Sequence, residues 1–163
     1  MKTLFLLAAT VLFSVSVNAQ QVTKVSMQAS GLTCSMCSNA INKSVKTLPF
    51  VEKVVSNIQT STFEISFKPG SKVDFDGLKK KVEDAGFFVS RFVASVNFNN
   101  TAIKADQPVV IGDKTFQFVN TKEAVLHGTK PVRILNKGFV SGKEFKKNAL
   151  ASATGTKVYY VTI

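Results

Sequence analysis

The chain has few of the side chains that most often hold metals or carry out catalysis. Its 163 residues include two cysteines and one histidine. Residues 97–163 contain no cysteine, and their acids are Asp106, Asp113, Glu123 and Glu144. No paired carboxylates, Ser-His-Asp set or phosphate-binding loop can be recognised there, which argues against a catalytic role. We therefore expect a protein that is not an enzyme and whose chemistry lies with the cysteines.

Long hydrophobic runs are equally scarce. The apolar run Leu4–Val17 is too short, and too interrupted by Thr and Ser, for a comfortable membrane span, and no later segment is apolar enough. Lys2 precedes this run and Val17-Asn18-Ala19 ends it, which is the pattern of a secretory signal peptide. We expect residues 1–19 to be removed on export, which gives a periplasmic or secreted protein without stable membrane insertion.

Acidic residues are about half as frequent as basic ones. Ten Asp and Glu against 21 Lys and Arg give a formal net charge of +11. In a cytosolic protein this balance would favour nucleic-acid binding. Export argues against that function, and the lysines are scattered, with Lys79-Lys80-Lys81 as the only run. We interpret the charge as solvated surface and expect no nucleic-acid partner; steering toward an acidic partner or an anionic membrane is the alternative.

The two cysteines lie close together in the stretch Gly31-Leu32-Thr33-Cys34-Ser35-Met36-Cys37, between a strand-like run and a helix-like run. Thiols at this spacing can converge, which suits either a soft metal ion or a small disulfide. Cys37 should lie in the first turn of the helix, where the positive end of the helix dipole favours the thiolate that binds metals. Thiolates prefer Cu(I), zinc and similar ions. A closed zinc site would lack half its ligands here, so two-coordinate Cu(I) or Hg(II) fits better.

The pattern of apolar residues up to residue 96 predicts four strands and two helices. We expect strands at Val22–Ala29, Val51–Ile58, Thr62–Phe67 and Phe87–Val96, a helix at Met36–Leu48, and a second helix that carries Leu78, Val82 and Ala85. Asp74 should cap the second helix, and Gly86 should adopt the left-handed conformation after its end. The order strand, helix, strand, strand, helix, strand predicts a ferredoxin-like α+β fold, βαββαβ.

Three motifs in this segment occur in the order and at the distances of a known family. They are the loop Gly31–Cys37, the corner Leu48-Pro49-Phe50-Val51, and the stretch Glu83-Asp84-Ala85-Gly86-Phe87. On these motifs, residues 22–92 resemble the heavy-metal-associated domain of copper chaperones, of copper ATPases and of the periplasmic mercury-binding protein. The resemblance implies reversible binding of a soft ion by Cys34 and Cys37 and its transfer to the exposed thiols of a donor or acceptor protein.

Two departures from the family pattern leave the implied ligands unchanged. Leu32 replaces the usual Met, which in the family mostly packs under the loop, and Phe50 replaces the corner Gly and indicates a different turn. Phe87 stands where the family has an aromatic or lysine side chain beside the metal loop. We therefore expect a metal centre at Cys34 and Cys37, with Cu(I) as the first choice of ion and Hg(II) or Zn(II) as the others.

Other interpretations of these residues stay open. Cys34 and Cys37 could form a redox dithiol, which would make the chain a thiol-disulfide redox protein, or an inert disulfide in a pure interaction protein. A disulfide that closes so small a loop would stabilise the fold little. Met36 could lend a thioether to Cu(I), but we expect it simply to separate the ligands. We expect His127 to be an ordinary surface or core residue.

The pattern changes after residue 96. A polar stretch with Asn97, Asn99, Asn100 and Thr101 predicts a linker between one domain at residues 20–96 and a second at 97–163. In the second domain we expect strands at Pro108–Ile111, Thr115–Asn120, Pro131–Leu135 and Lys157–Ile163, a hairpin turn at Gly112-Asp113 and a helix at Glu144–Ala151. These elements predict a small, mostly antiparallel β domain with one short helix and no recognisable role.

Overall fold

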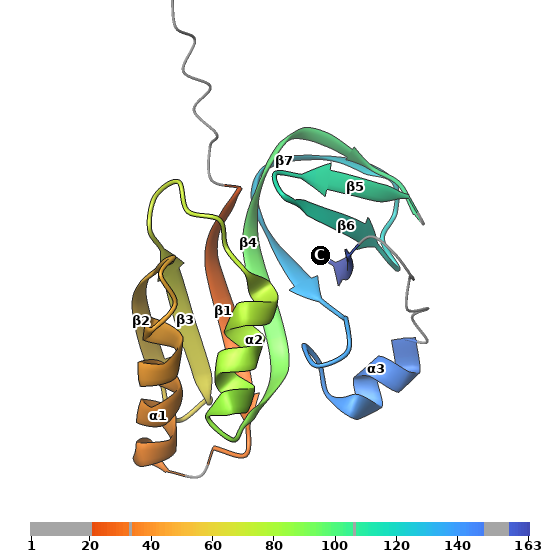
Figure 1. Ribbon diagram of the computed structural model, residues 1–163. Coiled ribbons are helices and arrows are strands. Elements are labelled where there is room, and N and C mark those ends of the chain that lie inside the picture. Colours follow the sequence, from red (N-terminus) through yellow and green to blue (C-terminus); the bar gives the residue numbers. More distant parts are fainter. Residues whose placement is uncertain (1–20, 33, 106, 149–156) are drawn as a thin grey trace, which may run out of the picture.

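The computed structural model describes residues 21–32, 34–105, 107–148 and 157–163 (Figure 1). The predicted signal peptide at residues 1–19 therefore lies outside the described residues, as do the last three residues of the predicted helix Glu144–Ala151. Within the described ranges, no helix combines the length and the apolar character that a membrane crossing needs.

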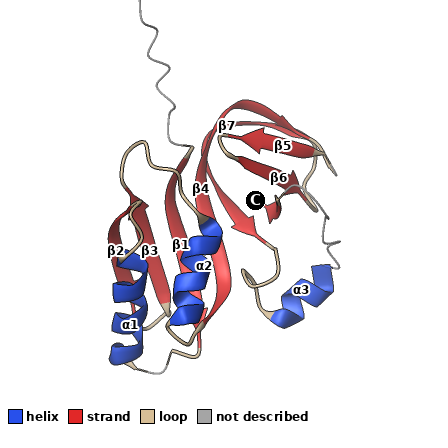
Figure 2. Cartoon of the chain, in the orientation of Figure 1, coloured by secondary structure: helices blue, strands red, loops and turns tan. Residues whose placement is uncertain are grey.

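The first half of the chain has the predicted order of elements. Its strands are β1 (Val22–Ser30), β2 (Val51–Asn57), β3 (Thr62–Phe67) and β4 (Phe88–Ile103), and its helices are α1 (Ser35–Lys46) and α2 (Phe75–Asp84). Antiparallel pairing places these strands in the order β2-β3-β1-β4. Both helices cover the same face of this sheet (Figure 2). The predicted ferredoxin-like α+β fold is therefore confirmed.

Alternation and helical spacing of apolar residues explain how this half folds. Phe63, Ile65 and Phe67 alternate along β3 and are buried, so they share one face of the sheet. Two helical signals are also confirmed. The Asp74 carboxylate caps α2 by accepting the N–H of Asp76 at 3.0 Å, and Gly86 has a φ of +88° just past the helix end.

The strand β4 continues through the stretch predicted as a linker. It runs to Ile103 and pairs with β7 (Ala124–Ile134), with a shift in register between Phe98 and Thr101. Asn100 lies in this shift with a φ of +45°, which asparagine tolerates better than most residues. The asparagines thus mark an irregularity within a strand, because buried apolar residues continue on both sides of them. The division into domains at residues 96 and 97 stays a prediction.

The second half adds the strands β5 (Pro108–Ile111), β6 (Lys114–Phe118) and β8 (Val158–Thr162) and the helix α3 (Gly142–Asn148). All eight strands of the described chain form one sheet, in the order β2-β3-β1-β4-β7-β8-β6-β5. The predicted hairpin is confirmed, since β5 and β6 pair antiparallel around Gly112. β7 begins at Ala124, earlier than predicted, and β6 pairs with β8 in parallel, which local patterns do not reveal.

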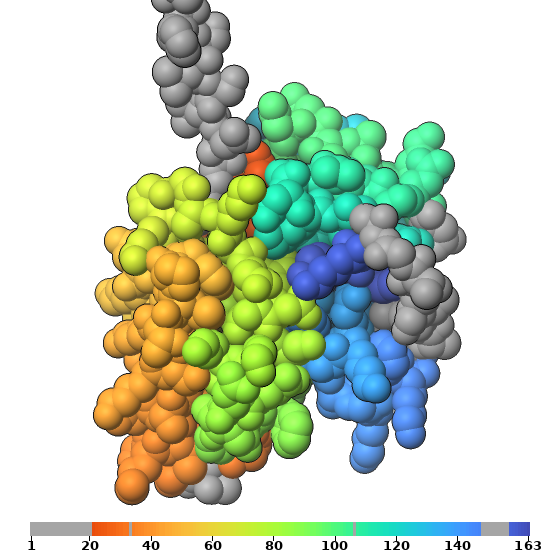
Figure 3. Space-filling model, viewed as in Figure 1, coloured from red at the N-terminus to blue at the C-terminus, as the bar shows by residue number. Residues whose placement is uncertain are grey.

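One cluster of buried hydrophobic residues joins the two halves. Phe75 of α2 lies edge-on to Phe92 of β4 and to Tyr159 of β8, with ring centroids 5.1 and 5.2 Å apart. Phe139, in the loop after β7, contacts both Phe92 and Tyr159. Figure 3 shows the C-terminal strand in dark blue against α2 in yellow-green. The described residues of the second half thus pack on the side of α2 as well as extending the sheet.

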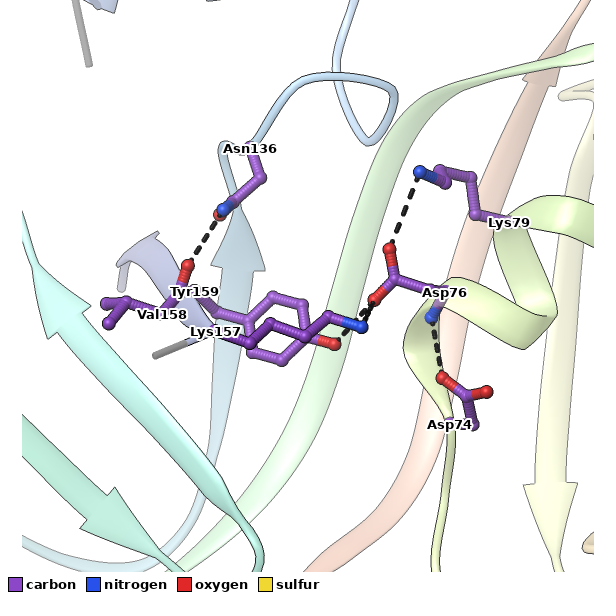
Figure 4. A network of polar contacts seen from close by, with 7 residues as sticks. All are labelled: Asp74, Asp76, Lys79, Asn136, Lys157, Val158 and Tyr159. Carbon is purple, nitrogen blue, oxygen red and sulfur yellow. Dashed lines mark hydrogen bonds and ion pairs between the residues drawn. The ribbon is translucent and has the colours of Figure 1, made fainter. Parts of the chain in front are cut away.

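A polar network at the same junction centres on Asp76 (Figure 4). The Tyr159 hydroxyl donates to Asp76 Oδ2 at 2.7 Å, Lys157 pairs with the same oxygen, and Lys79 Nζ lies 3.4 Å from Oδ1. Burial works to raise the pKa of Asp76, but the hydrogen bonds from Lys157 and Tyr159 and the nearby lysine charges outweigh it and lower the pKa. Burial and the bond to Asp76 raise the pKa of Tyr159.

Candidate metal centre

α1 begins at one end of the sheet (Figure 1), and the cysteine pair lies at this helix start. Ser30 at the end of β1 pairs with Phe88 at the start of β4, so both lie next to the loop. Gly31 then turns the chain with a φ of +84°, a conformation that glycine adopts without strain. Cys34 is the N-cap of α1, with an extended backbone, and the helix follows directly.

The structure brings the two predicted site residues together. The Sγ atoms of Cys34 and Cys37 are 2.7 Å apart, which is longer than the ~2.05 Å of a disulfide bond, and no disulfide joins them. Cys34 is exposed and Cys37 is partly buried. The two sulfurs therefore converge at an accessible bend, while their role as metal ligands stays a prediction.

The helix start supplies hydrogen bonds to one sulfur. Cys37 lies in the first turn of α1, as predicted, and its N–H donates to Cys34 Sγ at 3.3 Å. The hydrogen bond with the Cys37 side chain, followed by those from the N–H groups of Cys37 and Met36, lowers the pKa of Cys34, while burial opposes the shift. The first turn contains no acid that would repel a thiolate. Cys34 is therefore predisposed to the deprotonated form that binds soft metals.

Several hydrophobic residues lie in or next to the segment that carries the pair. Met36 is 81% exposed, and Phe88 is 68% exposed. Leu32 and Phe87 are partly buried against the core, and a Cβ placed on Gly31 would lie 3.9 Å from Phe87 Cδ1. Leu32 and Phe87 thus pack against the core, and Phe87 lies near Gly31 at the start of the loop.

The corner residue Phe50 has a structural explanation. Its side chain is 9% exposed, and its ring centroid lies 5.9 Å from that of Phe67 on β3. The aromatic side chain therefore closes the edge of the core near the start of β2. Phe50 thus has a packing role, and the expectation that this departure leaves the ligands unchanged stays a prediction.

Sequence reasoning missed Ser38, the residue after Cys37. Its side chain is 2% exposed, and its hydroxyl has no hydrogen-bond partner in the described part of the chain. The helical spacing of Ser38, Ile41 and Val45, the buried residues of α1, could have identified it as a buried position. His127, by contrast, is exposed on β7, as an ordinary surface residue would be.

The described residues offer two ligands and no larger set. Among them, no group of three or more His, Cys, Asp or Glu side chains is arranged to hold a metal ion. Two thiolates suit an ion that accepts two-coordinate binding, whereas structural zinc sites use four ligands. The arrangement can therefore bind a thiophilic ion at an exposed end of the molecule, where the ligands of another protein can approach.

Comparisons with known proteins agree with this site. The profile of the heavy-metal-associated domain matches residues 26–88. The probable copper-transporting ATPase HMA5 of Arabidopsis thaliana is 33% identical over 69 residues, 42% of this chain and 7% of that protein. The probable copper-exporting P-type ATPase of Archaeoglobus fulgidus is 35% identical over 71 residues, 44% of this chain and 9% of that protein. A solution structure of the yeast copper transporter domain Ccc2a is 30% identical and covers 41% of this chain and 90% of that chain, with a TM-score of 0.38.

These comparisons concern one part of the molecule. The chain spans less than a tenth of the length of the two ATPases. The matched range contains the cysteine pair, both helices of the first half, β2 and β3. Residues 26–88 of this chain therefore belong to the heavy-metal-associated domain family.

Proposed function

We propose that this protein captures a soft metal ion between the sulfurs of Cys34 and Cys37 and passes it to a partner protein by exchange of thiol ligands. The observation that carries the proposal is the approach of the two sulfurs to 2.7 Å at the exposed start of α1. The family of residues 26–88 supports metal binding, and the two curated relatives are named as copper-transporting or copper-exporting ATPases.

Cu(I) is the first candidate for the ion. Its preference for soft thiolates and its acceptance of low coordination numbers match a pair of cysteines. Hg(II) shares these preferences and is the second candidate. Zn(II) is the third, because a closed site would need two further ligands, and the described residues provide no group of three suitable side chains.

Transfer follows from the exposure of Cys34. A thiolate of the partner bonds to the ion while one bond from the ion to Cys34 or Cys37 breaks, and a second exchange releases the ion completely. The freed sulfurs take up protons from water, and no oxidant or reductant is consumed. We propose accordingly a transport function without a catalytic step, carried out after export of the chain guided by residues 1–19.

Anaerobic titration with Cu(I) in the presence of a competing chelator tests the proposal. We expect the reduced protein to bind one ion tightly, and Cys34→Ser and Cys37→Ser each to lose this binding. Met36→Leu is the matched control, because it removes the other exposed sulfur of the loop and should leave one ion bound. Tight binding by either cysteine variant would contradict the proposal.

A thiol-disulfide redox function is the second candidate. The short distance between the sulfurs and the lowered pKa of Cys34 favour it, because a thiolate next to a second thiol closes a disulfide readily. The reduction potential of the pair and its rate of disulfide reduction on insulin distinguish the two functions. Rapid turnover of insulin without metal would support the redox function.

A further inference from the structure

A cleft of about 220 Å³ lies where the two halves of the molecule meet. Its walls come from the segment before α2, from the turn between β5 and β6, and from the start of β8. The residues that line it are Lys72, Val73, Asp74, Asp113, Lys114, Lys157 and Tyr159. Sites for drug-sized ligands measure about 300–1,000 Å³, so a cleft of this size suits a smaller molecule.

Positive charge is in excess in the lining of this junction cleft, since three of its residues are lysines and two are aspartates. Both carboxylates already have partners within the protein. Asp74 accepts the N–H of Asp76 at 3.0 Å, and Asp113 Oδ1 lies 2.8 Å from Lys114 Nζ. A bound cation would be repelled by the three ammonium groups, whereas an anion would be attracted by them. The charges therefore favour an anion as the ligand.

Lys114 is the most deeply buried of the three lysines. Its side chain is only 6% exposed, and a lysine is rarely buried to this degree unless it is paired. An ammonium group has three N–H donors. Within the described chain, Asp113 accepts one of them, and the centroid of the Phe75 ring lies 5.1 Å from Nζ. Lys114 therefore keeps the capacity to donate to an oxygen atom placed in the cleft.

The other two lysines are more exposed. Lys157 pairs with Asp76 Oδ2, and its Nζ lies 5.7 Å from the centroid of the Tyr159 ring, which holds the ammonium at the wall of the cleft (Figure 4). Lys72 is exposed and forms no ion pair with another residue of the described ranges. Its charge is therefore the one most readily available to a ligand.

We propose that the junction cleft binds a small anion with several oxygen atoms, a phosphate or a carboxylate compound, through the ammonium groups of Lys72, Lys114 and Lys157. Hydrogen bonds between an ammonium and an anionic oxygen are about twice as strong as those between neutral groups. The three lysines come from three segments that are far apart in sequence. The bound anion therefore ties the segment before α2 to the second half of the molecule, independently of the candidate metal centre.

Thermal unfolding of the whole chain, kept reduced and metal-free, tests this proposal. The probes are inorganic phosphate and citrate, each at a few millimolar, with sodium chloride at the same ionic strength as the reference. A ligand that binds only the folded chain raises the unfolding midpoint as its concentration rises. We expect this rise with at least one of the two probes. The probe with the larger effect identifies a phosphate or a carboxylate as the preferred ligand.

Substitutions of single lysines locate the bound anion. Lys72→Ala should weaken binding and leave the midpoint in chloride unchanged, because the side chain is exposed and has no ion pair among the described residues. Lys114→Met keeps the apolar part of a buried side chain without the ammonium and should weaken binding roughly tenfold. Lys68→Ala is the matched control, because Lys68 is exposed in the same connection between β3 and α2 but does not line the cleft.

Three results would overturn the proposal. The first is a midpoint that neither phosphate nor citrate raises above its value in chloride. The second is a rise that persists in both Lys72→Ala and Lys114→Met, since the anion would then bind elsewhere. The third is an equal loss of binding in Lys72→Ala and Lys68→Ala, which would show a general effect of surface charge.

Discussion

Cys34 and Cys37 differ in exposure and in the hydrogen bonds they make, although both lie in one short loop. Cys34 is exposed and accepts bonds from the helix start, whereas Cys37 is partly buried in the first turn. An exposed sulfur with a lowered pKa is the better nucleophile and the easier atom for a partner to reach. We therefore expect the exchange of ligands to begin at Cys34.

The pKa of Cys34 provides a prediction at the scale of the residue. The hydrogen bond with the Cys37 side chain contributes most to lowering the pKa of Cys34. Cys37→Ala should therefore raise this pKa toward the usual range for a thiol. The rate of alkylation by iodoacetamide as a function of pH measures this change. Met36→Ala is the control, because it keeps the backbone N–H that bonds to Cys34. An unchanged pH profile in Cys37→Ala would contradict the assignment of the cause.

At the scale of the element, sequence patterns predicted the order of strands and helices in the first half of the chain. The alternation in β3 and the cap at Asp74 act over a few residues, and the structure places both as predicted. The approach of Cys34 and Cys37 was predictable for the same reason, since the two cysteines are neighbours in sequence. Ser38 was not, because whether its hydroxyl finds a partner depends on the side chains that surround it in the folded protein.

The cap of α2 is open to a direct test. Asp74→Ala should lower the free energy of unfolding by about 1 kcal/mol, because the N–H of Asp76 loses its acceptor. Chemical denaturation with urea measures this loss. Asp84→Ala, at the other end of the same helix, removes only an exposed ion pair with Lys80 and should have a smaller effect. Equal losses in the two variants would contradict the role of the cap.

At the scale of the whole molecule, the two halves share one sheet and one hydrophobic core. β4 carries the sheet from the first half into the second, and Phe139 and Tyr159 pack against Phe75 and Phe92. The sequence did not reveal this union, because the asparagine-rich stretch at 97–101 has the composition of a linker. Pairing between β4 and β7 and between β6 and β8 joins residues far apart in sequence, which local patterns cannot report.

The contact between Tyr159 and Asp76 should hold the halves together. Tyr159→Phe removes the hydroxyl that donates to Asp76 at 2.7 Å and should lower the free energy of unfolding by about 1–2 kcal/mol. Urea denaturation measures the loss, and Tyr160→Phe on the same strand is the matched control. A Tyr159→Phe protein as stable as the unaltered one would show that the bond adds nothing to the junction.

The same network makes stability depend on pH. The folded-state pKa of Asp76 lies below its unfolded value, so Asp76 contributes stability above the unfolded pKa and loses it as the pH falls through the folded pKa. The difference in unfolding free energy between the unaltered protein and Asp76→Asn should therefore be largest near neutral pH and shrink below about pH 4. A difference that stays constant down to pH 2 would contradict this linkage.

Two sulfur atoms of one exposed loop should hold one soft metal ion. X-ray absorption at the copper edge of the anaerobically loaded protein measures the neighbours of this ion. We predict one Cu(I) per chain with two sulfur neighbours, and no such signal from the Cys34→Ser, Cys37→Ser double variant. Copper bound through nitrogen or oxygen alone, or the same spectrum from the double variant, would contradict it.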